Sequence, residues 1–105
     1  MSCSAMDKEK ILNLLGLAMR AGKLVTGEEL TIGDIRSNKA KFVFVAADAS
    51  DNTRKKIKDK CSYYNVPCDE SFLHSELSHA IGRTRMVIGI NDQGFATKFK
   101  ELIKG

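Results

Sequence analysis

The run from Phe42 to Ala47 constrains the fold of this chain more than any other segment. It is unbroken, apolar and rich in β-branched and aromatic side chains, and polar Asp48 follows it directly. Strands that are covered on one face alternate polar and apolar residues, whereas strands covered on both faces read as continuous apolar runs. The run therefore predicts the central strand of a sheet that lies between two layers of other structure.

Helices and strands are predicted to alternate along the chain. Apolar residues at helical spacing, with Ser4 as the first cap and Gly22 as the first stop, predict helices over about 4–21, 27–37, 50–64, 73–81 and 91–103. Further strands are expected at 23–25, 66–68 and 86–90. This order predicts an α/β fold, a three-layer αβα sandwich whose mixed sheet has about four strands. We expect a single domain over residues 1–105.

The three cysteines indicate a reducing compartment. Cys3, Cys61 and Cys68 form neither an even disulfide framework nor a Cys-x-x-Cys pair. The amino terminus has no basic start followed by an apolar run, and no segment approaches about 18 consecutive apolar residues. We therefore expect a cytoplasmic protein that does not associate with membranes.

No set of side chains predicts an enzyme, a metal site or a cofactor. His74 and His79 lie about 140° apart around a helix, which does not pair them for a metal. Cys68 and His74 have no third ligand or base at a suitable spacing, and Cys61 falls on the apolar face of its helix. Asp48 follows the central strand, where α/β sheets often bind ligands, but a cap and turn explain it equally well.

The residues around Gly27 predict the start of the second helix. Thr26 suits an N-cap, and Glu29 completes a Thr-x-x-Glu capping box. Helix amino termini present unpaired N–H groups and partial positive charge, and a glycine there lets a phosphate or base edge approach the backbone. This helix is expected to bury Leu30 and Ile35 at most.

The basic residues point mildly toward a polyanionic partner. Lys and Arg outnumber Asp and Glu by 17 to 13, which gives a net charge of +4. The densest positive run, residues 54–60, lies on a predicted helix that must present a polar face to water, so a solvated face is its simpler explanation. Arg83 and Arg85 are more suggestive, because a loop flanked by Gly82 can adapt its shape to RNA while two guanidiniums contact phosphates or base edges.

Five ordered motifs resemble one family. They are Gly16–Lys23, Thr26–Leu30, Phe42–Ser50, Cys61–Pro67 and Ala80–Gly82. Together they resemble the kink-turn-binding ribosomal protein superfamily, of the ribosomal protein L-seven-Ae type, and most closely its small bacterial YlxQ-like branch. The resemblance runs from about Leu12 to Phe99, which is nearly the whole chain.

The resemblance implies a non-enzymatic αβα domain that binds RNA kink-turns, which are sharp bends built on tandem sheared G·A pairs. Family members hold the RNA with the glycine-led start of the second helix and with the loop before the last strand. The implied partners are kink-turn-like RNA, such as ribosomal RNA, and ribosome or translation factors. No cofactor is implied, and we expect a monomer. The implied RNA-binding residues are Arg20, Lys23, Gly27, Glu28, Glu29, Arg83, Thr84, Arg85 and Met86.

The chain departs from the family motif at the start of the second helix. Many members carry Asn-Glu-x-x-Lys where this chain has Glu29, Leu30 and Gly33. Glu29 can only accept a hydrogen bond, for example from an exocyclic amino group. Glu28 and Glu29 also stabilise the helix start itself, and both oppose an incoming phosphate.

Two other functions stay open at this point. The first is a protein-interaction module of the translation machinery that kept the fold without specific RNA readout, because Glu29, Leu30 and Gly33 replace the polar contacts of the family. The second, more remote, is a small hydrolase or redox enzyme built on Asp48 and the cysteines.

Overall fold

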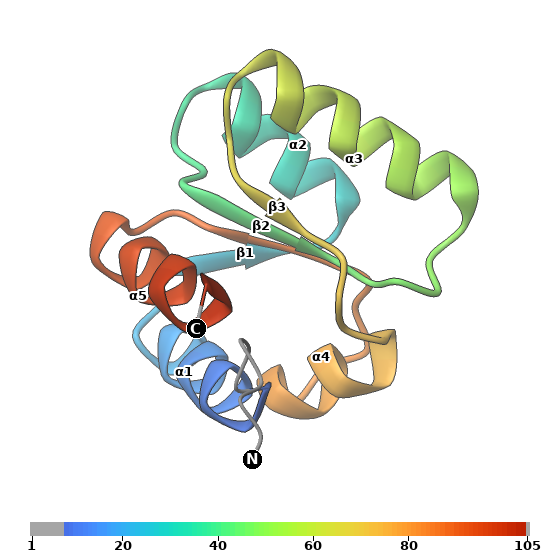
Figure 1. The fold of residues 1–105 in the computed structure, drawn as a ribbon. Helices are drawn as coiled ribbons and strands as arrows, with labels where there is room; N and C mark the ends of the chain where they lie inside the picture. The colour runs from blue at the N-terminus through green and yellow to red at the C-terminus, as the bar shows by residue number, and fades with distance from the viewer. Residues whose placement is uncertain (1–7, 105) are drawn as a thin grey trace.

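The computed structural model describes residues 8–104, which form five helices and four strands (Figure 1). The helices are α1 (Lys8–Arg20), α2 (Glu28–Arg36), α3 (Asp51–Tyr63), α4 (His74–Ile81) and α5 (Gln93–Lys104). The strands are β1 (Leu24–Thr26), β2 (Phe42–Val45), β3 (Cys68–Asp69) and β4 (Val87–Ile90). Within the described residues, helices and strands follow one another in the order that the sequence predicts.

The sheet is mixed and lies between two helical layers. Its strand order is β1-β4-β2-β3; β4 is antiparallel to both of its neighbours, and β2 is parallel to β3. Helices α2 and α3 cover one face, and α1, α4 and α5 cover the other (Figure 1). The predicted α/β class and four-stranded mixed sheet are confirmed, and the layers are those of an αβα sandwich.

The core is built around the two central strands. Every residue of β2 and β4 is buried, which confirms that Phe42–Val45 is covered on both faces. The Phe44 ring makes edge-to-face contacts with Phe72 and Phe99, at centroid distances of 5.9 and 5.0 Å, a geometry that the ring quadrupole favours. On the other face, Gly89 has no side chain where α2 packs against β4. A Cβ there would lie 3.1 Å from the Thr31 methyl group.

Two predicted helix ends are confirmed. Gly22, with φ of 70°, follows α1, and the amides of Gly22 and Lys23 donate to the carbonyls of Met19 and Ala18 at 3.1 and 2.9 Å. These two bonds satisfy carbonyls that a helix end would otherwise leave open. Ser50 caps α3, because its hydroxyl accepts an amide hydrogen bond from the first turn at 3.2 Å.

The predicted capping box at the start of α2 is wrong. Gly27 is the N-cap of this helix, and no side chain caps it. Thr26 instead pairs with Ile88 in the sheet, so its backbone is held in β1 by strand pairing. The Thr26 side chain is therefore not used as a cap, and Glu29 has no cap partner.

The predicted burial of Leu30 is also wrong. Its side chain is 64% exposed, whereas Thr31 and Ile35, one helical turn apart, are the buried residues of α2. Two short strands begin later than predicted, since β1 spans Leu24–Thr26 and β3 spans Cys68–Asp69. The predicted cap at Ser4 lies outside the described residues.

Candidate nucleic-acid interface

The start of α2 and the loop before β4 lie side by side. The Gly27 amide donates a hydrogen bond of 2.8 Å to the carbonyl of Val87. β1 and β4 are antiparallel with Thr26 opposite Ile88, so the chain leaves β1 next to the point where it enters β4. Residues 82–86 lead directly into Val87. The structure thus brings together the two surfaces that the sequence singled out separately.

The backbone at the start of α2 is open to a ligand. The first intrahelical bond runs from the Thr31 amide to the Gly27 carbonyl at 3.1 Å, and within residues 8–104 nothing accepts from the amides of Glu28, Glu29 and Leu30. Gly27 has φ of 97° and ψ of 153°, a conformation that essentially only glycine adopts. A Cβ at Gly27 would meet no atom within 4 Å, so the space beside this backbone is free.

The two glutamates of the first turn differ in their surroundings. The Glu28 carboxylate accepts hydrogen bonds from Lys56 Nζ at 2.7 Å and from Thr53 Oγ1 at 3.2 Å, which join α2 to α3. Chiefly because of the Lys56 bond, the pKa of Glu28 is lowered from its ordinary value. Glu29 is exposed and makes no hydrogen bond within the described residues. Glu29 is therefore the carboxylate of this turn whose oxygens are not engaged by α3.

Ser78 in α4 fixes the backbone of the loop. Its carbonyl accepts from the amides of Gly82 and Arg83 at 2.8 and 3.2 Å, and Gly82, with φ of 78°, ends the helix as predicted. The Ser78 hydroxyl accepts from the Arg85 amide at 3.0 Å. The loop thus leaves α4 along a defined path.

The loop side chains face outward in different ways. Arg83 and Thr84 are exposed, and the Arg83 guanidinium makes no hydrogen bond or ion pair with the described residues. The Arg85 guanidinium donates to the Thr84 carbonyl at 2.7 Å. Met86 is 41% exposed, while its carbonyl accepts from the Ala46 amide of the chain after β2 at 2.8 Å. Neither loop arginine is paired with a carboxylate of the described residues, and the Arg83 guanidinium makes no hydrogen bond with them.

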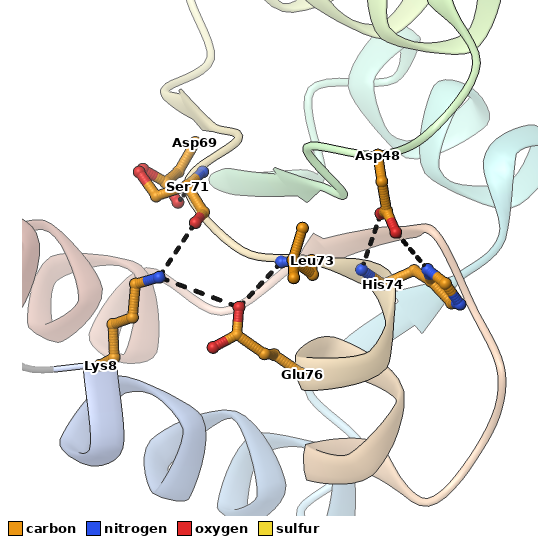
Figure 2. A network of polar contacts seen from close by, with 7 residues as sticks. All are labelled: Lys8, Asp48, Asp69, Ser71, Leu73, His74 and Glu76. Atoms are coloured by element: carbon orange, nitrogen blue, oxygen red, sulfur yellow. Dashed lines mark hydrogen bonds and ion pairs between the residues drawn. The ribbon is translucent and has the colours of Figure 1, made fainter.

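Asp48 caps α4, the helix from which the loop leaves (Figure 2). The N-cap of α4 is Leu73, whose side chain cannot accept a hydrogen bond. Asp48 supplies the missing acceptor: its carboxylate accepts from the His74 amide at 2.9 Å and lies 2.6 Å from His74 Nδ1. These bonds, first of all the one from the amide, lower the pKa of Asp48. The structure therefore assigns Asp48 to capping, which the sequence left open against a ligand site.

A second set of contacts joins α4 to α1. Glu76 accepts from the Leu73 amide at 2.9 Å, and Lys8 Nζ lies 3.9 Å from the Glu76 carboxylate (Figure 2). Lys8 also donates to the Ser71 carbonyl at 3.3 Å and lies 5.3 Å from the centroid of the Phe72 ring. These contacts hold the amino-terminal end of α4 against α1, while the bonds to Ser78 fix the loop at the other end of the helix.

Arg20 and Lys23 lie apart from Gly27. Lys23 precedes β1, and its carbonyl accepts from the Asn91 amide at 3.0 Å, at the end of the sheet opposite Gly27. Four strand steps of about 3.3 Å put the two backbones roughly 13 Å apart. Arg20, the last residue of α1, lines a groove with Gly82. It therefore approaches the loop from the α1 side.

The basic run of α3 is largely paired with carboxylates. Arg54 pairs with Asp51, Lys56 with Glu28 and Lys58 with Glu70. These pairs support the interpretation of the run as a solvated helix face. Lys56 has a further role, because it neutralises the Glu28 carboxylate in the first turn of α2. No local pattern in the sequence indicates that role of Lys56, because 28 positions separate it from Glu28. The bond from the His74 amide to Asp48 likewise spans 26 positions, beyond the reach of a local pattern.

The His, Cys, Asp and Glu side chains of the described residues form no metal site. Within residues 8–104 no three His, Cys, Asp or Glu side chains gather as metal ligands. Cys61 is buried as predicted; its hydrogen bond with Cys68, and then burial, raise the pKa of its thiol. His79 is exposed on α4.

No helix among the described residues combines the length and apolar character needed to span a membrane.

Comparison with known proteins gives one family. The ribosomal protein L7Ae/L30e/S12e/Gadd45 family matches residues 9–100. A protein of Enterococcus faecium called RNA-binding protein YlxQ is 65% identical over 99 residues, which cover 94% of this chain and 96% of that protein. A protein of the same name from Bacillus subtilis (strain 168) is 48% identical over 91 residues, with coverages of 86% and 91%.

Two solved structures are similar to this fold. One is described as a protein with unknown function from Bacillus halodurans C; it has a TM-score of 0.88 and 40% identity, and the match covers 91% of this chain and 98% of that one. The other is the Giardia lamblia 15.5kD RNA binding protein, with a TM-score of 0.79 and coverages of 98% and 90%. Its identity is only 18%, so this second likeness concerns the fold alone.

Proposed function

The chain belongs to the ribosomal protein L7Ae/L30e/S12e/Gadd45 family, as its motifs predict, and we propose that it binds sharply bent, G·A-paired RNA of the kink-turn type. The family and the names of its two YlxQ relatives mark a non-enzymatic RNA-binding protein. Beyond RNA binding in general, we propose that the target RNA is kinked. We also propose that the protein associates with the ribosome, which places it in the cytoplasm.

One observation carries the proposal. The hydrogen bond from the Gly27 amide to the Val87 carbonyl joins the start of α2 to the loop that precedes β4. Open backbone amides and a positive helix end therefore lie next to Arg83 and Arg85. Two such adjacent surfaces can contact both arms of a bent RNA.

Each residue has a distinct role in the proposal. The amides after Gly27 donate to phosphate or base edges, and Glu29 accepts from a base amino group. The guanidiniums of Arg83 and Arg85 bind phosphate, and the exposed Met86 contacts the apolar face of a base or sugar. Glu28 acts indirectly, since its pairing with Lys56 reduces the repulsion that a second free carboxylate would exert on phosphate.

Lys23, Arg20 and Thr84 are proposed as outer contacts. Lys23 and Arg20 contribute charge from the α1 side, at a distance from Gly27, and Thr84 is an exposed loop residue with a hydroxyl that can donate or accept. Their effects on affinity should be smaller than those of Arg83.

Titration of two matched RNAs tests the proposal. The first is a duplex with tandem G·A pairs next to a short bulge, and the second replaces the bulge and the G·A pairs with Watson–Crick pairs. We expect the kinked RNA to bind at least about tenfold more tightly, which corresponds to roughly 1.4 kcal/mol. Equal affinities would leave only charge attraction and remove the specific function.

A protein-interaction module of the translation machinery is the second candidate. The exposed Leu30 favours it, because this apolar side chain occupies the place of a polar family residue at the start of α2. The double variant Arg83→Ala, Arg85→Ala separates the two functions. An RNA-binding protein loses affinity for the kinked duplex, whereas an interaction module keeps it and loses a protein partner.

A further inference from the structure

The groove between α1 and α4 enters the function proposed so far only through Arg20, as an outer source of charge. It has a volume of about 620 Å3, within the range of ligand sites, and its lining includes Gly16 and Ala80. The two helices approach closely at this point, because a Cβ at Gly16 would lie 3.1 Å from the Ala80 carbonyl oxygen. Small residues thus let the helices approach closely, and the exposed lining residues Asn13, Leu17, Arg20 and His79 form the rim of the groove.

The rim carries groups that suit a nucleic acid strand. Arg20 and His79 are exposed on opposite helices, and the Arg20 guanidinium makes no hydrogen bond or ion pair with residues 8–104. Asn13 adds an amide that both donates and accepts, and Leu17 is 53% exposed. Within the described part of the chain, no carboxylate lines the groove. A phosphate would thus meet a cation and no opposing charge, while a sugar or base face would meet apolar surface.

The groove is continuous with the interface already described. Gly82 is both a lining residue of the groove and the first residue of the loop, and Arg83 follows it directly. A strand that leaves Arg83 and passes along the end of α4 enters the groove and reaches Arg20. This continuity, together with the charge of the rim, favours RNA over a peptide as the occupant.

We propose that the α1–α4 groove, lined by Asn13, Leu17, Arg20 and His79, binds an unpaired RNA strand that continues from the RNA held at α2 and the loop. The inference rests on the proposed function and extends the RNA site beyond the kinked segment. Arg20 contacts a phosphate of that strand, and the apolar rim contacts its sugars or bases. The protein then recognises both a bent core and a single-stranded flank.

Binding measurements with extended RNAs test the inference. A short RNA contains only the kinked core, and two longer RNAs carry about six additional unpaired nucleotides at the 5′ or the 3′ end, within the site sizes of single-strand binders. We expect one of the two extensions to tighten binding of the unaltered protein by about fivefold. It should also increase the dependence of log K on log salt by about 0.7 for each additional phosphate that the protein neutralises.

Two variants locate the tighter binding in the groove. Arg20→Gln removes the cation, and Leu17→Glu places a carboxylate on the rim at a position exposed enough to tolerate it. In both variants the ratio of the affinities for the extended and the short RNA should fall to about one. Arg36→Gln, which removes the same charge at the far end of α2, is the matched control and should keep the full ratio.

The results separate the inference from the function on which it rests. If the short kinked RNA binds no better than its unkinked control, the proposed function fails and the inference fails with it. If the kinked core is bound specifically but neither extension tightens binding, the inference alone is overturned. It is overturned as well if the extension still tightens binding in Arg20→Gln and Leu17→Glu, since the flank then binds elsewhere.

Discussion

Glu28 and Glu29 are neighbours in sequence, yet they should respond differently to mutation. Glu29→Ala should lower stability by no more than the about 0.3–1 kcal/mol of an exposed carboxylate at a helix start, because its side chain makes no hydrogen bond within the described residues. It should reduce the preference for kinked over unkinked RNA by roughly fivefold or more, since a good base contact is worth about 1–3 kcal/mol. Titration of both RNAs measures this preference.

Glu28→Ala should act mainly on stability and in a pH-dependent way. The folded-state pKa of Glu28 lies below its ordinary value of 4.5, so its contribution is complete above that value and is lost as the pH falls through the lowered pKa. The melting temperature of the variant should be lower than that of the unaltered protein at neutral pH, and the two should converge in acid. Melting curves at several pH values check this; a constant difference would contradict the role of the Lys56 pair.

Gly27 and Gly33 should respond to alanine with opposite signs. Gly27→Ala forces a side chain into a region that costs about 1–3 kcal/mol, and its methyl group also stands where a ligand must approach. Gly33 lies inside α2 with open space around it, so Gly33→Ala should stabilise the protein by about 0.5–1 kcal/mol. Denaturant unfolding measures both values. Changes of the same sign would contradict the assigned backbone of Gly27.

At the scale of elements, α4 depends on a cap from outside its own segment. Asp48→Ala removes the acceptor of the His74 amide, and Asn substituted for Asp48 would keep an acceptor oxygen there. We expect the alanine variant to have a lower melting temperature than the asparagine variant, and faster amide exchange in α4 and residues 82–86.

The pH dependence of this cap has a definite sign. The folded-state pKa of Asp48 is lowered, so the cap stabilises the protein above the ordinary aspartate pKa, and this contribution is lost as the pH falls through the lowered value. The difference between the unaltered protein and Asp48→Ala should therefore shrink in acid. A difference that grows in acid would show that the carboxylate is not the stabilising form.

Elements with strong local signals could be predicted from the sequence, and elements set by distant partners could not. The run Phe42–Val45 is apolar enough to mark a strand by itself, and Gly22 and Gly82 mark helix ends because they adopt positive φ. Thr26 failed as a cap because pairing with Ile88, far along the chain, holds it in β1. Short strands and first helical turns depend on such pairings more than on their own residues.

The same distinction applies to the candidate site. Gly27 and the loop around Arg83 could each be predicted from local residues, but their contact through Val87 depends on the antiparallel pairing of β1 with β4. The pairing of Glu28 with Lys56 likewise joins two helices that no local pattern connects. Sequence reasoning could therefore name the parts of the surface, and the tertiary structure decides how they are combined.

At the scale of the molecule, the position of the positive charge should matter more than its amount. Because the net charge is only +4, we expect local cations to contribute more to RNA binding than the overall charge does. Arg83→Gln with Arg85→Gln should lower the affinity for the kinked RNA by about tenfold and reduce the salt dependence by about one for each phosphate that is no longer neutralised. Arg36→Gln with Lys39→Gln removes the same charge at and beyond the end of α2. Equal losses in the two double variants would indicate a diffuse charge effect.

The central claim is that the start of α2 and the loop before β4 form one RNA-binding surface, and amide NMR tests it most directly. The isotope-labelled protein is titrated with the kinked duplex and, separately, with its Watson–Crick control. We predict that the amides of residues 27–30 and 83–86 shift together, with one dissociation constant, for the kinked RNA only. Shifts confined to one of the two segments, or equal shifts with both RNAs, would contradict the claim.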